Sequence, residues 1–323
     1  MFISFGYNNF NTTVYKTIKG GDDHLKRLIS SAASDIIKMS APELKQAILA
    51  SEGRTIVGET VVTTSPLIEG LSNAEVMAAF GADIIILNEL DVFHPVVPGV
   101  DGIEASEIIQ TIKHLTGRPI GVNLEPVDPD VGLLEHAVQL PKGRQVSPES
   151  LAAANDLGID ILFLTGNPAT GVSMSAIGAA VVLAKQYFNG LVFAGKMHGA
   201  GMQESIVDEA QLTQFVKDGA DGVLIPAVNT VPGVYEEENR QVTKAIHALG
   251  GVVVATIGTS QESATTSVIE AIGLSNKRVG VDCHHIGDGS YGRMPDPENI
   301  VALSLAVRGK RHTYFRMAQS IRR

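Results

Sequence analysis

Polar and charged side chains stand at the ends of short apolar runs in this sequence, and they are the residues able to do chemistry. Lys196 directly follows the apolar run Leu191–Gly195, so its amine should stand at the end of a buried segment. Such a lysine can act as a nucleophile that forms a Schiff base, or as a fixed cation beside a carboxylate. The plainer interpretation is an ion pair with Glu125 or Glu59 that holds the rim together. His198 shares a strand face with Lys196, and we predict catalytic roles for both.

Two glutamates, Glu59 and Glu125, are the candidate general bases. A carboxylate at the end of a strand can take a proton from a substrate, or it can coordinate Mg²⁺ or Mn²⁺. Asn123 precedes Glu125 by two residues and shares its strand face, so we expect this amide to contact the ligand. The alternative for both glutamates is a solvated charge at the rim. A divalent cation is thus a candidate cofactor whose ligands the sequence does not identify.

The run Asp282-Cys283-His284-His285 also contains groups that can bind metals. We expect the side chains of Asp282 and His284 to share a strand face over the proposed site. Cys283 should point to the opposite face and pack there. A buried hydrogen-bonded network is the commoner use of such a run, and no His-Glu-x-x-His motif supports zinc. An oxygen-rich site that uses the glutamates is therefore preferred over one built on these histidines.

Two glycine loops predict an anion site. They read Thr256-Ile257-Gly258-Thr259-Ser260 and His285-Ile286-Gly287-Asp288-Gly289-Ser290. Glycine lets backbone N–H groups approach an anion, and small hydroxyls add donors. The residues predicted to hold a phosphate or carboxylate are Gly258, Thr259, Ser260, Gly287 and Gly289, with Asn123 beside them. The alternative is two ordinary turns, and the charge of Asp288 would oppose a dianion unless it faces away.

A third glycine-rich loop, Thr165–Ser173, precedes a helix-like stretch. Ser173 can cap that helix, whose N-terminus would then lie near the site as a second place for an anion. Capping alone is the simpler explanation.

The elements that must position these side chains are read from the alternation of apolar runs with helix-like stretches. The strand-like runs are Thr55–Val62, Asp83–Glu89, Ile120–Glu125, Asp160–Thr165, Leu191–Lys196, Gly222–Pro226, Val252–Thr256 and Val279–His284. The helix-like stretches between and after them are Asn73–Phe80, Ile103–Leu115, Pro148–Leu157, Met174–Phe188, Glu209–Asp218, Tyr235–Leu249, Ala264–Leu274 and Pro297–Val307. Nearly continuous apolar strands are typical of a parallel sheet buried on both faces. From Gly158 onward, helix-ending glycines recur about every thirty residues, the length of one βα unit.

Eight βα units predict a single (β/α)₈ barrel over residues 55–323, preceded by an arm and helices over residues 1–54. Within that extension we expect a short strand near Thr13–Ile18, a helix over Leu25–Ile37, and a second helix capped by Ser40 and Glu43. An open doubly wound sheet would need a Gly-x-Gly-x-x-Gly turn after its first strand, and none is present. In such barrels the chemistry lies at the carboxyl ends of the strands. The long loop over residues 126–147 is a candidate lid.

The composition limits the partners. A formal net charge of −10 disfavours nucleic acid and anionic membrane as ligands. The single cysteine excludes an intramolecular disulfide framework, and no apolar run reaches the roughly 18 residues of a membrane span. No secretory signal is recognised, so we expect a cytoplasmic protein. The expected partners are a small anionic metabolite and further copies of the chain in a homo-oligomer.

The glycine loops after the seventh and eighth strands resemble those of the phosphate-binding TIM-barrel superfamily. Ala50-Ser51-Glu52-Gly53-Arg54, Ala79-Phe80-Gly81-Ala82-Asp83 and the Gly166–Gly171 loop also resemble an uncharacterised bacterial barrel family, itself loosely similar to phosphoenolpyruvate mutase and isocitrate lyase-type barrels. That type carries a Lys-x-Cys-Gly-His loop, where this sequence has Gly195-Lys196-Met197-His198-Gly199.

Taken together, the residues predict lyase or isomerase chemistry at a carbon next to a carbonyl of a small phosphorylated or carboxylated metabolite. Lys196 would be the Schiff-base nucleophile or the cation, and Glu125 or Glu59 the base. The alternative is a non-catalytic barrel that binds a phosphometabolite and signals through a partner. That protein would keep the glycine loops without needing the carboxylates.

Overall fold

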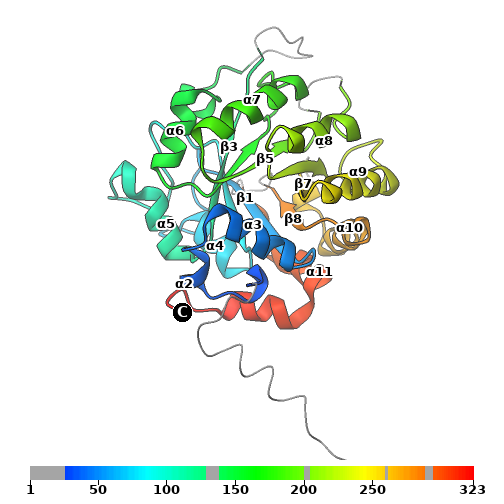
Figure 1. The fold of residues 1–323 in the computed structure, drawn as a ribbon. Coiled ribbons are helices and arrows are strands. Elements are labelled where there is room, and N and C mark those ends of the chain that lie inside the picture. Colours follow the sequence, from blue (N-terminus) through cyan, green and yellow to red (C-terminus); the bar gives the residue numbers. More distant parts are fainter. Residues whose placement is uncertain (1–25, 129–137, 200–203, 259–260, 288–293) are drawn as a thin grey trace, which may run out of the picture.

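A closed barrel of eight parallel strands forms the centre of the molecule in the computed structural model (Figure 1). The structure describes residues 26–128, 138–199, 204–258, 261–287 and 294–323. Each strand pairs with the next along the chain, and β8 closes the ring by pairing with β1. The strands are β1 (Thr55–Val61), β2 (Ile84–Asn88), β3 (Ile120–Leu124), β4 (Ile161–Leu164), β5 (Leu191–Gly195), β6 (Gly222–Pro226), β7 (Val252–Ile257) and β8 (Cys283–Ile286). The predicted (β/α)₈ fold is confirmed.

Helices alternate with the strands around the barrel. They are α4 (Asn73–Ala79), α5 (Ile108–Thr116), α6 (Pro148–Asp156), α7 (Met174–Tyr187), α8 (Glu209–Lys217), α9 (Glu236–Ala248), α10 (Thr266–Val279) and α11 (Pro297–Ala318). Short 3₁₀ turns are η2 (Ala105–Glu107), η3 (Lys142–Arg144) and η4 (Gln261–Ser263). No helix among the described residues is long and apolar enough to span a membrane.

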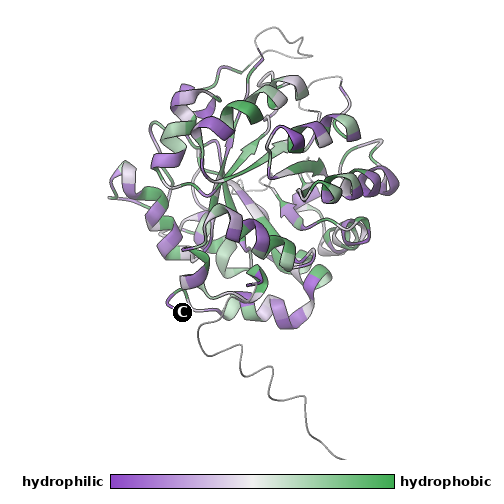
Figure 2. Cartoon of the chain, in the orientation of Figure 1, coloured by the Kyte–Doolittle hydropathy of each residue, from purple (hydrophilic) through white to green (hydrophobic). Residues whose placement is uncertain are grey.

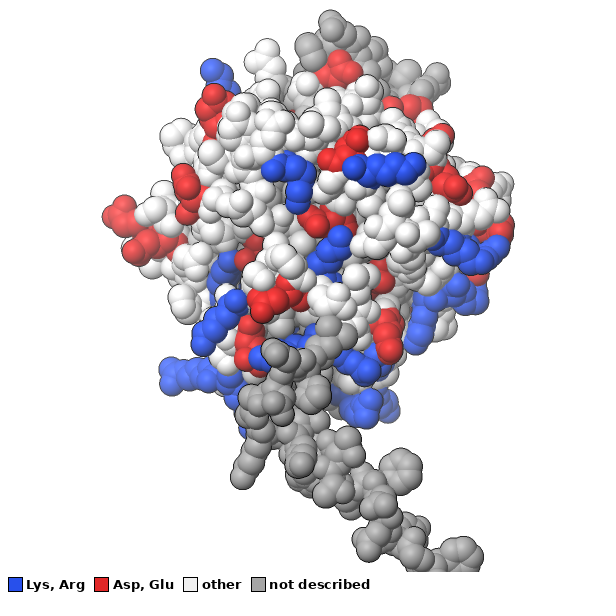
Figure 3. Space-filling model, in the orientation of Figure 1, with Lys and Arg blue, Asp and Glu red and all other residues white. Residues whose placement is uncertain are grey.

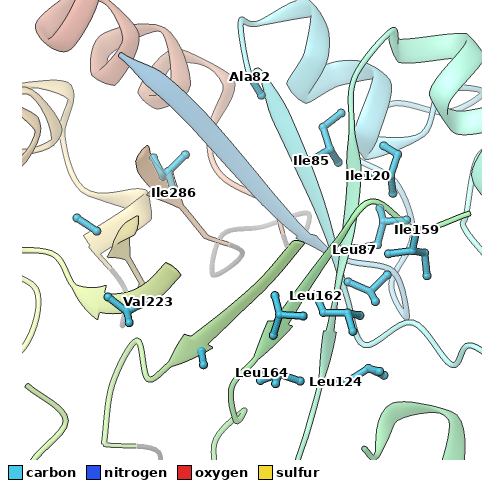
Figure 4. Close-up of a cluster of buried hydrophobic side chains, with 14 of the residues drawn as sticks. Ala82, Ile85, Leu87, Ile120, Leu124, Ile159, Leu162, Leu164, Val223 and Ile286 are labelled. Carbon is cyan, nitrogen blue, oxygen red and sulfur yellow. The ribbon is translucent and has the colours of Figure 1, made fainter. Parts of the chain in front are cut away.

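Two apolar layers stabilise this arrangement, as expected for strands covered on both faces. Side chains such as Ile85, Leu87 and Leu162 point outward from the strands and pack in the larger buried cluster, which also holds helix residues (Figure 4). The other face fills the barrel, where Phe163 and Phe193 meet edge to face with ring centroids 5.9 Å apart. The hydropathy colouring of Figure 2 shows the strands as largely apolar and the helices as mixed.

The segment before β1 closes one end of the barrel. It contains η1 (Leu28–Ser30), α2 (Ala33–Ile36) and α3 (Ala41–Ala50), and α3 lies in front of the strands in Figure 1. Leu44 and Ile48 of α3 join the apolar cluster inside the barrel. The predicted cap is present, since the Ser40 backbone N–H donates to Glu43 Oε2 at 2.8 Å. The predicted helix over Leu25–Ile37 is wrong over its described part, because the extended backbone of Ser31 and Ala32 divides it into η1 and α2. The predicted strand near Thr13–Ile18 lies outside the described residues.

A buried charge cluster lies at the same end of the barrel. Asp83, just before β2, pairs with Arg308 Nη1 at 2.5 Å and Arg316 Nε at 2.7 Å, both on α11. Arg118 donates to Ala82 O at 2.8 Å beside them. All four charged side chains are buried. This cluster ties α11 to the amino ends of the strands, away from the end expected to carry the chemistry.

The β8 prediction is wrong in position. Val279 belongs to α10, and Gly280 ends that helix with φ +94°, a conformation that favours glycine. The strand therefore begins at Cys283 and runs to Ile286. Two helices are also longer than predicted: α10 extends to Val279 and α11 to Ala318, with non-helical backbone at Gly309.

The surface seen in Figure 3 carries acidic and basic side chains interspersed over this face, without a broad area of one sign.

Candidate active site at the barrel mouth

The carboxyl ends of the strands bring a buried carboxylate, an amide and an imidazole together. Glu59 of β1 accepts a hydrogen bond from Asn123 Nδ2 of β3 at 2.6 Å through Oε1. Its second oxygen, Oε2, lies 2.5 Å from Nε2 of His285 on β8. All three residues are at most 3% exposed. Glu59, predicted as a base, and Asn123, predicted as a ligand contact, are thus brought together with a histidine assigned to neither role.

Three buried polar atoms in this region have no hydrogen-bond partner among the described residues. They are Oδ1 of Asn123, Nδ1 of His285 and Oγ1 of Thr165, which follows β4. Leaving such a group unpaired costs about 1–3 kcal/mol. Buried orphans of this kind therefore call for an explanation, and a ligand that completes their hydrogen bonds is one.

Glu125 lies at the same end of the barrel in a different network. Arg144 Nη2 donates to its Oε1 at 3.0 Å, and the Asn167 backbone N–H donates to its Oε2 at 2.9 Å. The Asn167 amide also donates to Oε1 at 2.9 Å and pairs with Asn88 of β2. Both oxygens of Glu125 therefore hold neighbouring segments, the η3 turn and the loop after β4. This arrangement suits a positioning role better than proton transfer.

Lys196 is completely buried directly after β5. Its ammonium forms an ion pair with Glu204, which is 21% exposed in its side chain. The carboxylate of Glu204 also accepts the backbone N–H of Met174, the first residue of α7, at 3.2 Å through Oε2. Lys196 thus forms an ion pair, as considered from the sequence, but with Glu204 and not with Glu59 or Glu125.

His198 lies close enough to this pair to feel its charge. Burial lowers the pKa of His198, and the positive charge of Lys196 lowers that pKa further, while Glu59 opposes the shift. The imidazole is therefore neutral near pH 7 and can accept or donate a hydrogen bond at either ring nitrogen. Lys196 and Glu59 therefore both lie close enough to His198 to affect its charge state.

The expectation that Asp282 and His284 face the mouth is wrong. Asp282 accepts the Val253 N–H and lies 2.8 Å from Nε2 of His247 on α9, so it faces the outer helices. His284 shares that outer face, with its Nε2 3.1 Å from Gly53 O. Burial lowers the pKa of His284 to about 4. His285 takes the inward direction, which it shares with Cys283, a residue packed inside the barrel.

Of the five predicted anion-binding loop residues, Thr259, Ser260 and Gly289 lie outside the described part of the chain. Gly258 and Gly287 are side by side, since a Cβ built on Gly287 would lie 3.9 Å from Gly258 Cα. The Gly287 N–H donates to Ile257 O at 2.8 Å and so continues the β7–β8 ladder. This amide is therefore not available to an anion, contrary to the prediction.

The residues that could hold Mg²⁺ or Mn²⁺ fit such an ion poorly. Within the described ranges, no three His, Cys, Asp or Glu side chains come together as potential metal ligands. Both oxygens of Glu59 and both oxygens of Glu125 already accept hydrogen bonds, and Arg144 places a positive charge beside Glu125.

Comparison with known protein families identifies the family of this chain. Residues 29–323 match the family model described as Domain of unknown function (DUF7916). The chain belongs to this family. No curated protein shows significant similarity to the sequence.

Solved structures with a similar fold share little sequence with this barrel. A 2,3-dimethylmalate lyase, described as a PEP mutase/isocitrate lyase superfamily member, is 16% identical with a TM-score of 0.47, over 77% of this chain and 81% of that one. A phosphoenolpyruvate phosphomutase from Streptomyces platensis subsp. rosaceus is 14% identical with a TM-score of 0.46, over 76% and 80%. Thiamine phosphate pyrophosphorylase from Pyrococcus furiosus is 15% identical with a TM-score of 0.43, over 80% and 97%. Two of these three structures, the dimethylmalate lyase and the phosphomutase, are of the barrel type that the sequence resembles.

Proposed function

We propose that this protein is an enzyme that moves protons at a carbon next to a carbonyl, as a lyase or isomerase of a small carboxylated or phosphorylated metabolite. The observation that carries the proposal is the buried Glu59 carboxylate held between Asn123 and His285 at the carboxyl ends of the strands. In barrels of this kind that end carries the chemistry.

His285 is the base in this proposal. When its Nε2–H donates to Glu59, its Nδ1 presents a lone pair, and that nitrogen has no partner among the described residues. Glu59 fixes the ring and stabilises the imidazolium that forms on proton uptake. The proton leaves the substrate carbon for Nδ1, and the C–H electron pair moves into the new C=C bond of an enolate. Asn123 holds the second oxygen of Glu59 and keeps the carboxylate in place.

Lys196 serves as the fixed cation that balances the enolate charge. Its ion pair with Glu204 supports this role over that of a Schiff-base nucleophile, which needs a neutral amine. Borohydride reduction in the presence of a keto substrate distinguishes the two, because only a Schiff base yields a stable adduct at Lys196. EDTA treatment followed by addition of Mg²⁺ or Mn²⁺ tests whether a divalent cation takes part. Because the described residues fit such an ion poorly, we expect no loss of activity with EDTA.

Hydrogen exchange with solvent tests the proposal without knowledge of the full reaction. The protein is incubated in D₂O with pyruvate, oxaloacetate and 2-oxoglutarate, and loss of the C3–H signal is followed by NMR. We expect exchange above the buffer rate for at least one acid. His285→Gln and Glu59→Gln should each slow it by about 100-fold or more, the usual contribution of a general base.

His114→Gln is the matched control, because His114 is an exposed histidine of α5 whose Nδ1 lies 2.8 Å from Gln110 O of the same helix, and the exchange rate of this variant should equal that of the wild type. Exchange that persists in both site variants would overturn the assignment. Absence of exchange, together with ligand binding that survives alanine at Glu59, Glu125 and Lys196, would instead favour a non-catalytic binding barrel.

A further inference from the structure

Glu204 forms a bridge between two donors that come from different elements. One oxygen accepts from the Lys196 ammonium, and the other accepts from the Met174 N–H at 3.2 Å. Lys196 is fully buried, whereas the Glu204 side chain is 21% exposed and belongs to the segment between β5 and α8. Lys196 is therefore the buried partner of this ion pair. Glu204 is the partly exposed one, and it lies in the loop between β5 and α8.

The amino end of α7 presents backbone N–H groups that two different side chains accept. The helix has 14 residues, and its dipole favours a negative charge at this end. Ser173 caps it by accepting the Ala176 N–H at 3.0 Å, and the same hydroxyl donates to Asp128 Oδ2 at 2.8 Å. The cap thus serves Ala176, while the Met174 N–H takes the Glu204 carboxylate as its acceptor.

A third polar group lies at the end of β4, the strand next to the one that Lys196 follows. Thr165 follows β4 and is 3% exposed, and its hydroxyl has no hydrogen-bond partner within the described ranges. Leu164 of β4 lies opposite Ala194 of β5, which brings Thr165 level with Gly195, the residue before Lys196. Thr165 also has the same strand parity as Phe163, whose side chain packs inside the barrel. The unpaired hydroxyl is therefore buried at the end of β4, level with the residue that precedes Lys196 on the neighbouring strand.

We propose that the Glu204 carboxylate is an internal stand-in for the carboxylate of the substrate. A substrate carboxylate would displace Glu204, place one oxygen on Lys196 and the other on the Met174 N–H, and accept a further hydrogen bond from Thr165. This inference rests on the proposed function, because the carboxylate belongs to the metabolite on which His285 acts. It places the anion between β4 and β5 instead of at the glycine loops after β7 and β8.

The stand-in has a thermodynamic consequence that an ordinary buried ion pair lacks. An internal group that occupies a site raises the apparent Kd of an external ligand, because the intrinsic Kd is divided by the fraction of molecules in which the site is open. Removing Glu204 should therefore tighten carboxylate binding. If Glu204 merely neutralises Lys196, its removal leaves an uncompensated buried charge and lowers stability without a site built to receive a carboxylate.

Calorimetric titration of the whole protein with pyruvate tests this, with inorganic phosphate titrated in parallel. We expect Glu204→Ala to lower the Kd for pyruvate by about tenfold. Thr165→Val, which keeps the shape and removes the hydroxyl, should raise it several-fold, and Lys196→Met should abolish binding. Glu209→Ala is the control, since Glu209 is an exposed acid at the start of α8 and its loss should leave the Kd unchanged.

An unchanged or higher Kd in folded Glu204→Ala would overturn the inference. So would a Kd that falls for phosphate and not for pyruvate, because the site would then be one for phosphate. Binding needs no turnover, so the two proposals can fail separately. If the Kd values follow the predicted pattern but no hydrogen exchange is seen, only the proposed function is contradicted. If exchange is seen but the Kd values do not follow the pattern, only the stand-in role of Glu204 is contradicted.

Discussion

Two histidines that are adjacent in sequence have opposite surroundings in this barrel. His284 points toward the outer helices, where burial lowers its pKa to about 4 and keeps it neutral. His285 points into the barrel and contacts Glu59. The difference follows from the alternation of side chains along β8, so the chemical role of each imidazole is decided by strand position and not by residue type.

His247, a third histidine, provides a test of a single residue that lies outside the proposed active site. The hydrogen bond to Asp282 raises the pKa of His247, although partial burial opposes the shift. A raised pKa in the folded state stabilises the protein below the unfolded-state value of about 6.5, and this stabilisation is lost as the pH rises through the folded-state value. His247→Gln should therefore reduce the free energy of unfolding more at pH 5.5 than at pH 8.5.

The difference should be below about 1 kcal/mol, because the His247 side chain is 38% exposed and solvent screens the pair. Urea denaturation of variant and wild type at both pH values measures it. Equal losses at the two pH values would contradict the assignment of this pair.

At the scale of elements, strand positions were predictable and loop contributions were not. Seven strands lie within about one residue of their predicted ends, because a run buried on both faces is nearly all apolar. In β8 both faces carry polar residues, so periodicity could not choose between His284 and His285. Arg144 and Glu204 were missed because each lies between the predicted strands and helices, and nothing in the sequence links Glu204 to the amino end of α7.

Gly195 shows how one element fixes the position of Lys196, a residue of the proposed site. This last residue of β5 has φ +148°, and a Cβ placed there would lie 2.2 Å from Leu224 O on β6. Gly195→Ala must therefore shift the backbone of the residue that precedes Lys196. We expect a loss of about 2–4 kcal/mol in the free energy of unfolding, together with weakened ligand binding.

Gly250→Ala is the matched control, because Gly250 has φ +71° and open space around a built Cβ. Its loss should be about 1–2 kcal/mol, the cost of the backbone conformation alone. Equal losses in the two variants would show that contact with β6 contributes nothing.

For the whole molecule, the contacts that hold distant segments together lie at the end opposite the proposed active site. Asp83 is completely buried and joins β2 to α11 through Arg308 and Arg316, and it also accepts the Ile56 N–H at 2.8 Å. Burial alone would raise the pKa of Asp83, but the two guanidinium groups outweigh it and hold the pKa below its ordinary value. One carboxylate thus connects the first two strands to the last helix.

Asp83→Asn should lower the free energy of unfolding by about 3–5 kcal/mol at pH 7, because it leaves buried guanidinium groups without their counter-charge. A carboxyl group with a lowered pKa stabilises the fold above its unfolded-state value of about 3.9, and this stabilisation is lost as the pH falls. Guanidinium denaturation at pH 7 and pH 4 measures the effect, which should be smaller at pH 4. A loss below about 1 kcal/mol at pH 7 would refute the role of Asp83.

The pairing of β1 with β8 also governs how the chain reaches its fold. Asp83 and Arg308 are separated by 225 residues, and the β1–β8 seam joins segments about as far apart. Contacts of such long range form slowly, because the entropy of closing the loop must be lost before the contact is made. During synthesis β1 can pair with β2 at once, but its other edge has no partner until β8 leaves the ribosome. We therefore expect seam closure to limit the folding rate, and the open edge of β1 to be where incomplete chains associate with one another.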